Sequence, residues 1–382
     1  MKLRKIPKFT TFQHPFRTWR KFRRTGALVQ QIKQDLLQLG HSEKTVQNLL
    51  TSCSALRLLL LDIVVLIFRL FIYRFRSNLD SIPWDSNKSY LICMNHYSHQ
   101  DSMLLLSELS RTDITPFFPV SFASTHLNKG LVGFIYRGSN VAFISRTEKN
   151  DSRLIRDLLR LLVKYKVTMI LCPEGGWSCN GNLKRFKLGM LSMMPADADL
   201  EILPIKLQSS RTFGDLNFSR IRQTKTWNTS EGLTNIIQAL PDLMKFKGFC
   251  YINCGPSLTL TENLSSSAEQ IKKSIESLAV YSQFEQECLT VFRLLFSGKR
   301  KHDIPISQEF GEIFEWHRYT EKELQDILYF SCNQFIYRAI EEHKNLRLAY
   351  EDFIFRENMD LHETKDSFFD FQLRSMRDSF DL

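Results

Sequence analysis

Short apolar runs that alternate with helical patterns, between residues 89 and 260, constrain the fold of this chain most strongly. Each run has the length and composition of a β-strand. The segment DSRLIRDLLRLLVKYK at 151–166 places its apolar residues at helical spacing. Strands that alternate with helices predict an α/β fold with a mixed, mostly buried sheet and flanking helices. The expected strands are YLICM, FFPVSFAS, NVAFISR, VTMILCP, EILPIKL and FCYINCG, and Pro204 in EILPIKL indicates an edge or a bulge.

Changes in composition divide the chain into three regions. Residues 1–80 hold a basic arm and a membrane-associating helical region, after which the segment SIPWDSNK breaks the helical pattern. Residues 81–260 hold the predicted α/β domain. Residues 261–382 are Phe-rich and helical in pattern, so we expect a helical C-terminal region there.

The net charge of +10 is concentrated at the start of the chain. Residues 1–24 hold nine Lys or Arg and no acid, so the remaining chain carries +1, ten less nine. Aromatic side chains are interleaved with these bases, a mixture suited to an anionic membrane surface, where each base contributes about 1 kcal/mol. Nucleic acid and a merely solvated tail are the alternatives. We expect membrane lipids, and no nucleic acid, as partners.

The segment LLLLDIVVLIFRLFIY at 58–73 is the one stretch of the sequence that is apolar enough to associate with a membrane. As a helix it would span about 24 Å, less than the roughly 30 Å of a hydrocarbon core. Asp62, Arg69 and Arg76 lie seven residues apart and would share one helix face. This pattern favours a helix lying in the membrane interface over a short or tilted spanning helix or a buried core helix. The start MKLRKIPKFTTF has no apolar core typical of a signal peptide.

The eight cysteines are scattered, without any C-x2-C pair, and most lie inside apolar runs. This distribution predicts buried free thiols rather than disulfides or a zinc framework. We therefore expect the folded domain to face the cytosol.

The stretch NHYSHQD connects the expected strand YLICM to a helix formed by SMLLLSEL, with Asp101 or Ser102 as its N-cap. Four residues separate His96 from Asp101, so a tight turn can bring the carboxylate to an imidazole nitrogen. A carboxylate there fixes the tautomer and makes the other nitrogen a better base. The pair can then take a proton from a substrate hydroxyl.

Three other readings of the stretch stay open. It can be a capped helix with incidental histidines. Cys93, His96 and His99 have three-residue spacing and could bind zinc, although no fourth ligand is evident. Ser98 could be a nucleophile, but it lies in no G-x-S-x-G elbow.

Later strand ends carry further polar groups. GSNVAFISR delivers Arg146 at the end of a strand, and LCPEGGWSCNGNLKRFKLG places Glu174 beside Gly175 and Gly176, followed by a basic loop with Lys187. Glycines let backbone N–H groups approach a substrate closely, and cations suit a phosphate.

The blocks NHYSHQD, GSNVAFISR, CPEGGWS with FKLG, and ILPIKL occur in this order over residues 89–207. In this the chain resembles the phospholipid and glycerol acyltransferases, which include glycerol-3-phosphate and lysophosphatidate acyltransferases. The resemblance implies a glycerolipid acyltransferase-like fold for residues 81–260. It implies that His96 is the general base and that Asp101 orients it. It also implies an acceptor pocket shaped by Arg146, Glu174, Gly175, Gly176 and Lys187. Trp177 stands where the family usually has an arginine, which leaves the acceptor open.

The resemblance implies a membrane-associated O-acyltransferase of phospholipid biosynthesis. The donor would be acyl-CoA or acyl carrier protein, and the acceptor glycerol-3-phosphate or a lysophospholipid such as lysophosphatidate. We expect no cofactor beyond the donor substrate and no metal. The expected location is the membrane, peripheral, monotopic or single-pass, with the enzymatic domain in the cytosol. A catalytically silent membrane adaptor on the same fold and a metal-dependent hydrolase are the alternatives.

Overall fold

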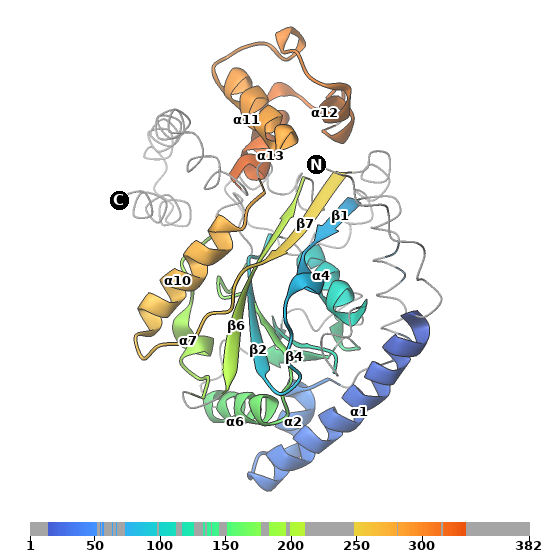
Figure 1. Cartoon of the computed structure of the whole chain (residues 1–382), viewed down its shortest axis with the longest axis vertical. Helices are drawn as coiled ribbons and strands as arrows, with labels where there is room; N and C mark the ends of the chain where they lie inside the picture. The colour runs from blue at the N-terminus through green and yellow to red at the C-terminus, as the bar shows by residue number, and fades with distance from the viewer. Residues whose placement is uncertain are drawn as a thin grey trace.

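A seven-stranded sheet lies at the centre of the described structure, which is a computed structural model, and helices cover both of its faces (Figure 1). The strand order is β1-β7-β6-β2-β5-β3-β4. Every adjacent pair is parallel except β6 and β7. The predicted mixed, mostly buried sheet is confirmed. The strands are β1 (Tyr73–Ser77), β2 (Ser89–Met94), β3 (Val120–Ser124), β4 (Val141–Ile144), β5 (Met169–Leu171), β6 (Leu200–Ser209) and β7 (Gly248–Cys254).

The structure describes residues 14–51, 54, 56, 63, 66, 73–97, 99–111, 117–125, 133, 136–138, 140–144, 151–176, 183–195, 199–210, 248–280, 282–314 and 316–333. No helix among these residues is long and apolar enough to cross a membrane. The apolar segment 58–73 lies mostly outside them, so the interfacial helix stays a prediction.

The last residue of this segment and the four residues after it form a strand, not a helix. Tyr73–Ser77 is β1, which pairs with β7 and aligns Arg76 with Tyr251. The prediction that Arg76 shares a helix face with Asp62 and Arg69 is therefore wrong. The apolar run gave no sign of this change, because the partner of β1 lies far along the chain.

Pro204 lies inside the sheet, in β6 between β7 and β2, and the edge-strand prediction is wrong. Its carbonyl accepts a hydrogen bond from the Gly255 N–H at 2.9 Å, just beyond the last β6–β7 pair, Ile205 with Cys254. The N–H and C=O of one strand residue point to the same side. The N–H that proline lacks would therefore point past the end of β7, where the ladder does not need it.

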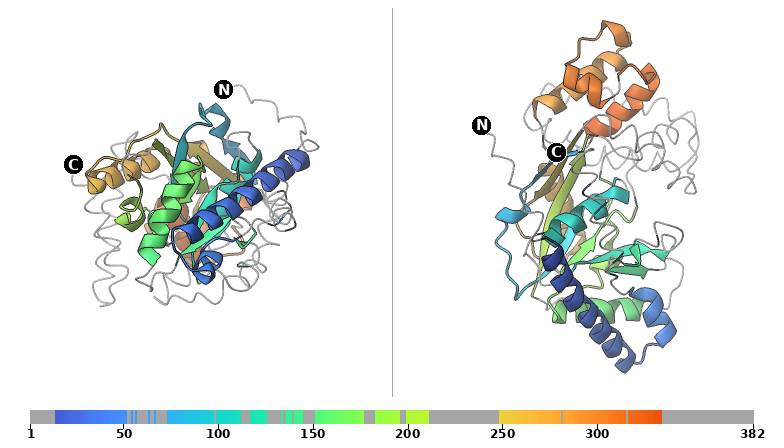
Figure 2. Two further views of the ribbon diagram at one scale, coloured as in Figure 1. Left: turned by 90° about the horizontal axis from the view of Figure 1, so that it is seen from below. Right: turned by 90° about the vertical axis from the view of Figure 1, so that its right-hand side faces the viewer.

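Alternate residues of each strand pack on opposite faces of the sheet. In β2, Leu91 and Cys93 belong to one apolar cluster, and Ile92 and Met94 to the other. The first cluster packs under α1 (His14–Gln38), α2 (Glu43–Leu49), α6 (Asp151–Lys164), α7 (Leu188–Leu191) and α10 (Leu264–Ser277), and the second under α4 (His99–Arg111). Figure 2 shows α1 running beside α6, which it contacts.

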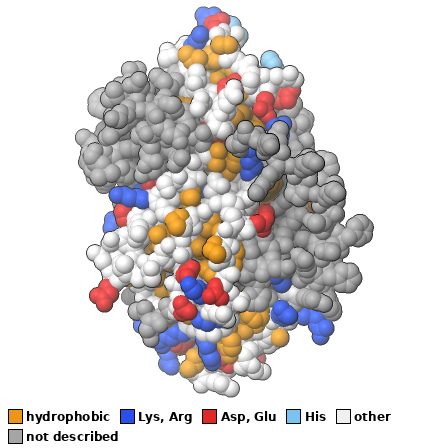
Figure 3. All heavy atoms as spheres, in the orientation of Figure 1, with side chains coloured by type: hydrophobic (Ala, Val, Ile, Leu, Met, Phe, Trp, Pro, Cys, Tyr) orange, Lys and Arg blue, Asp and Glu red, His pale blue; other side chains and the backbone are white. Residues whose placement is uncertain are grey.

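Basic side chains gather at the lower end of the face shown in Figure 3. Helix α6 is apolar on its inner side, where Leu158 is fully buried. Arg153, Arg156 and Arg160 are exposed on its outer side. The predicted helix at 151–166 is thus confirmed as a surface helix with one apolar face.

The C-terminal helices form a third apolar cluster. Phe249 at the start of β7 packs on Phe284 with ring centroids 5.0 Å apart. The Gln208 side chain exchanges two hydrogen bonds with the backbone of Val280. These contacts fix the cluster to the end of the sheet where β6 stops, at the top of Figure 1. The helices are α11 (Gln283–Phe296), α12 (Gln308–Ile313) and α13 (Glu321–Asn333), with a 3₁₀ turn at Lys301–Asp303.

Six cysteines fall among the described residues, and all are free. Five of them are buried, and Cys172 is half-buried. The prediction of buried free thiols is confirmed for these five.

Two asparagines bind the backbone of a distant residue in the same way. The Asn95 side chain accepts from the Leu207 N–H at 2.7 Å and donates to the Leu207 carbonyl at 2.8 Å. The Asn78 side chain makes the matching pair with Cys254 at 2.8 and 2.9 Å. Asn95 is fully buried, whereas Asn78 is exposed.

We predict that Asn95→Ala lowers the free energy of unfolding much more than Asn78→Ala. The first change leaves a buried N–H and a buried C=O without partners, at about 1–3 kcal/mol each, whereas water can replace the second side chain. Denaturant unfolding of both variants and the wild type measures the difference. Equal losses would contradict the role assigned to Asn95.

Candidate active site

The turn between β2 and α4 carries His96 and Asp101. Helix α4 begins at His99, so Asp101 lies in its first turn, and the prediction of Asp101 or Ser102 as N-cap is wrong. Asp101 Oδ2 instead accepts the Tyr97 backbone N–H at 2.6 Å. A carboxylate in the first turn can satisfy an N–H that precedes the helix, and the helix dipole favours its charge.

The same carboxylate oxygen faces the catalytic candidate. His96 Nδ1 lies 3.4 Å from Asp101 Oδ2. Asp101 is fully buried, while the His96 side chain keeps 16% of its surface exposed. The structure therefore brings the two side chains together at the carboxyl end of β2. Such contacts are often long without substrate and tighten when it binds.

Glu174 joins two loops beneath His96. It follows β5, which lies beside β2 in the sheet. Its Oε1 accepts the His96 N–H at 3.0 Å and its Oε2 accepts the Lys184 N–H at 2.9 Å. Burial raises the pKa of the Glu174 carboxyl to about 7, against the two N–H donors and the charges of Lys184 and Lys206, which lower it. Glu174 therefore positions the backbone of His96.

The two glycines after Glu174 differ in what they require. Gly175 has φ +67°, and a Cβ there would lie 2.8 Å from Lys187 Cδ, so the Lys187 stem passes directly over it. At Gly176 a Cβ would meet none of the described residues within 4 Å. The Lys187 N–H donates to the Pro173 carbonyl at 2.8 Å, and its side chain is exposed. The turn thus brings a cation to the same sheet end as His96.

Arg146, Trp177 and Ser98 lie outside the described residues, and so does the side chain of His99. Strand β4 ends at Ile144, two residues before Arg146, and runs parallel to β3. The expected role of Arg146 stays a prediction.

Three residues of the site, Asn95, Tyr97 and Lys206, were not singled out from the sequence. Asn95, just after β2, joins the end of that strand to β6 through its hydrogen bonds with the backbone of Leu207. Lys206 on β6 is 2% exposed, and its Nζ donates to the Tyr97 hydroxyl at 2.6 Å. The signal for Lys206 was present, since a lysine inside an apolar strand has to find a partner when it is buried.

Among the described residues, no group of three or more His, Cys, Asp or Glu could hold a metal ion. Cys93 is fully buried in the apolar cluster that packs under α6. Burial raises the pKa of its thiol to about 12.

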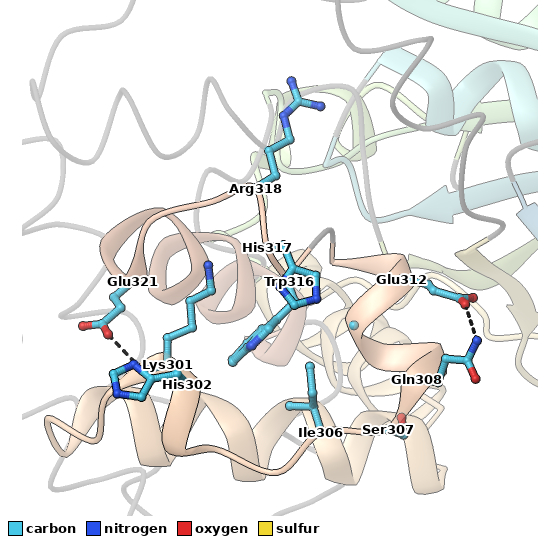
Figure 4. Close-up of a pocket in the computed structure, with 11 residues that line it drawn as sticks. Lys301, His302, Ile306, Ser307, Gln308, Glu312, Trp316, His317, Arg318 and Glu321 are labelled. Carbon is cyan, nitrogen blue, oxygen red and sulfur yellow. Dashed lines mark hydrogen bonds between the residues drawn. The ribbon is translucent and has the colours of Figure 1, made fainter.

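A pocket of about 980 Å³ lies in the C-terminal helices, apart from His96 (Figure 4). Trp316 lies within it, and the Lys301 ammonium is 5.9 Å from the Trp316 ring. Its lining mixes cations with Glu312 and Glu321 and contains none of the predicted site residues.

Residues 74–208 match the family model named Acyltransferase. This range contains β2, β5 and the turns that carry His96, Asp101 and Glu174. The region that carries the candidate site is therefore similar to acyltransferases, as the four sequence blocks predicted.

Two curated relatives are glycerol-3-phosphate acyltransferases. The protein from Aeromonas hydrophila is 26% identical over 202 residues, which is 49% of this chain and 23% of the relative. The protein from Colwellia psychrerythraea is 25% identical over 198 residues, 50% of this chain and 24% of the relative. The matched region thus spans about a quarter of these relatives. The crystal structure of the 1-acyl-sn-glycerophosphate acyltransferase from Thermotoga maritima is 16% identical, with a TM-score of 0.38, over 71% of this chain and 99% of that chain.

The raised pKa of Glu174 predicts a pH dependence of stability. The native state holds this proton more tightly than the unfolded state, where the pKa is near 4.5. Stability from this group is therefore lost as pH rises from about 4.5 to about 7, by roughly 3 kcal/mol. Glu174→Gln should remove this loss.

Denaturant unfolding across this pH range measures the difference between wild type and Glu174→Gln. The exposed Glu269→Gln is the matched control and should follow the wild-type pH dependence. Parallel pH curves for wild type and Glu174→Gln would contradict the assignment.

Proposed function

We propose that this protein is a membrane-associated O-acyltransferase. It moves a fatty acyl group from acyl-CoA or acyl carrier protein to a hydroxyl of glycerol-3-phosphate or of a lysophospholipid such as lysophosphatidate. The observation that carries the proposal is the His96–Asp101 pair at the carboxyl end of β2, inside the region that is similar to acyltransferases. The names of the two curated relatives support a glycerolipid acceptor.

In the proposed reaction His96 is the general base. Asp101 faces Nδ1, which leaves Nε2 as the nitrogen that takes the proton from the acceptor hydroxyl. The hydroxyl oxygen attacks the thioester carbonyl, and backbone N–H groups at the strand ends stabilise the tetrahedral oxyanion. The carbon–sulfur bond then breaks, the thiolate leaves, and the proton held by His96 is released to it or to water.

A direct transfer accounts for the environment of the nearby thiols. Burial raises the pKa of Cys93 to about 12 and that of Cys172 well above its ordinary value. Neither thiol is therefore prepared to act as a nucleophile and form an acyl-enzyme. The acceptor hydroxyl is itself the nucleophile in this scheme.

The cations around the glycine turn support an acceptor that bears a phosphate. Arg185 and Lys187 are exposed in the segment before α7, and Lys184 is half-buried. Trp177 in place of the family arginine shifts the phosphate contact to these side chains. Their charge suits a phosphate monoester.

Membrane association is part of the proposal. Leu56, Ile63 and Leu66 have helical backbone and side chains that are 62%, 45% and 43% exposed. Their spacing of seven and three residues is that of one helix face. Exposed apolar side chains together with the basic arm favour a chain lying at an anionic lipid surface, where lipid acceptors reside.

The test is acyl transfer from a radiolabelled long-chain acyl donor, as acyl-CoA and as acyl carrier protein, to glycerol-3-phosphate, lysophosphatidate and neutral lyso-lipids. His96→Ala should slow transfer by about 10²- to 10⁴-fold, because it removes the general base. His41→Ala is the matched control, since His41 also pairs with a carboxylate, Asp157 at 2.8 Å, away from the site. It should transfer at the wild-type rate.

The outcomes separate the alternatives. Label moving to a phosphate-bearing acceptor, and lost in His96→Ala, supports the proposal. Label reaching only neutral acceptors would support acyl transfer by His96 but contradict the proposal that the acceptor bears a phosphate. If folded, membrane-bound wild type transfers label from neither donor, the enzyme proposal is wrong and the catalytically silent adaptor is favoured.

A further inference from the structure

A buried lysine lies beneath the turn that carries His96. Lys206 is on β6, one residue beyond the last β2–β6 pair, Met94 with Ile205. Its neighbours Ile205 and Leu207 face the apolar cluster under α4, so Lys206 faces the side of the sheet that α10 covers. A side chain that is 2% exposed and charged is expensive to bury unless it is paired.

The partner of Lys206 is the residue next to His96. Its Nζ donates to the Tyr97 hydroxyl at 2.6 Å and lies 5.2 Å from the centre of the Tyr97 ring. Tyr97 is itself fully buried, so no water competes for this contact. The Tyr97 side chain is thereby held at its hydroxyl.

The backbone of Tyr97 in turn holds the catalytic carboxylate. Its N–H donates to Asp101 Oδ2, the same oxygen that faces His96 Nδ1. A shift of Tyr97 would therefore move Asp101 relative to the imidazole. A contiguous set of contacts runs from Lys206 through Tyr97 and Asp101 to His96.

Two carboxyl groups interact electrostatically with the Lys206 ammonium. Burial lowers the pKa of Lys206, while Glu276 on α10 and Glu174 both favour its charged form. Glu174 is also the acceptor of the His96 N–H. The charge of Lys206 thus interacts with Glu174, which binds the backbone of His96.

We propose that Lys206 is a positioning residue for the acyl-transfer site, holding Tyr97 so that Asp101 stays in register with His96. It touches neither donor nor acceptor. The role rests on the proposed function of His96, and it adds a residue from β6 to the machinery carried by the turns after β2 and β5.

Lys206→Met keeps the length of the side chain and removes its charge and its donor. We expect kcat to fall by about tenfold to a hundredfold with KM unchanged, because the reacting groups are displaced while substrate contacts remain. Lys88→Met is the matched control. Lys88 also pairs through its ammonium, with Glu201, but at the opposite end of β2 from His96. It should leave kcat unchanged.

A second measurement does not depend on activity. Hydrogen exchange of the peptide 95–101, read by mass spectrometry on the full chain, reports the opening of the Tyr97 N–H. Lys206→Met should speed this exchange, and Lys88→Met should not. Hydrogen exchange therefore tests the positioning role of Lys206 even if the wild type transfers no acyl group. In that case the proposed function is wrong, while the exchange result still supports or contradicts the positioning role.

Tyr97→Phe removes the acceptor of Lys206 while keeping the ring, and it replaces Lys206→Met if that variant does not fold. In kcat, Lys206→Met with Tyr97→Phe should cost no more than the larger single change, because both break one contact. Additive losses, or wild-type exchange of 95–101 in Lys206→Met and Tyr97→Phe, would overturn the proposal.

Discussion

The structure of the site depends on one buried carboxylate. Glu174 binds backbone N–H groups from two loops, at His96 and at Lys184, and so ties the turn after β2 to the loop after β5. Burial raises the pKa of the carboxyl to about 7, because its charged form is disfavoured away from water. Glu174 thereby holds the backbone of His96, the proposed general base, while Asp101 faces its imidazole ring.

The need of buried polar groups for hydrogen-bond partners also explains the other contacts at this end of the sheet. Strand β6 runs on beyond the end of β2, so its last residues lose one neighbour. The Asn95 side chain hydrogen-bonds the backbone of Leu207 in place of that strand. The Tyr97 hydroxyl accepts a hydrogen bond from the buried side chain of Lys206. Each group that satisfies the sheet end also braces the turn that carries His96. Stability and positioning are therefore properties of the same residues.

Local sequence was sufficient for much of this, because apolar runs and helical spacing identify elements without knowing their partners. Six expected strands and the helix at 151–166 are present, and His96 meets Asp101 across a short turn. Errors arose where the partner is distant. Tyr73–Ser77 reads as part of a helix until β7 is known, and Pro204 reads as an edge residue until Gly255 is seen. Lys206 and Tyr97 are 109 residues apart, so their pairing is invisible to periodicity.

The central claim is that the Asp101 carboxylate acts on the imidazole of His96. Asp101→Asn tests it most directly, because an amide oxygen can still accept the Tyr97 N–H while the negative charge is lost. The measurement is the rate of acyl transfer from labelled acyl donor by protein whose fold matches the wild type. Our account predicts a loss of about tenfold or more, since the charge that supports the protonated base is gone. Transfer at the wild-type rate would contradict it.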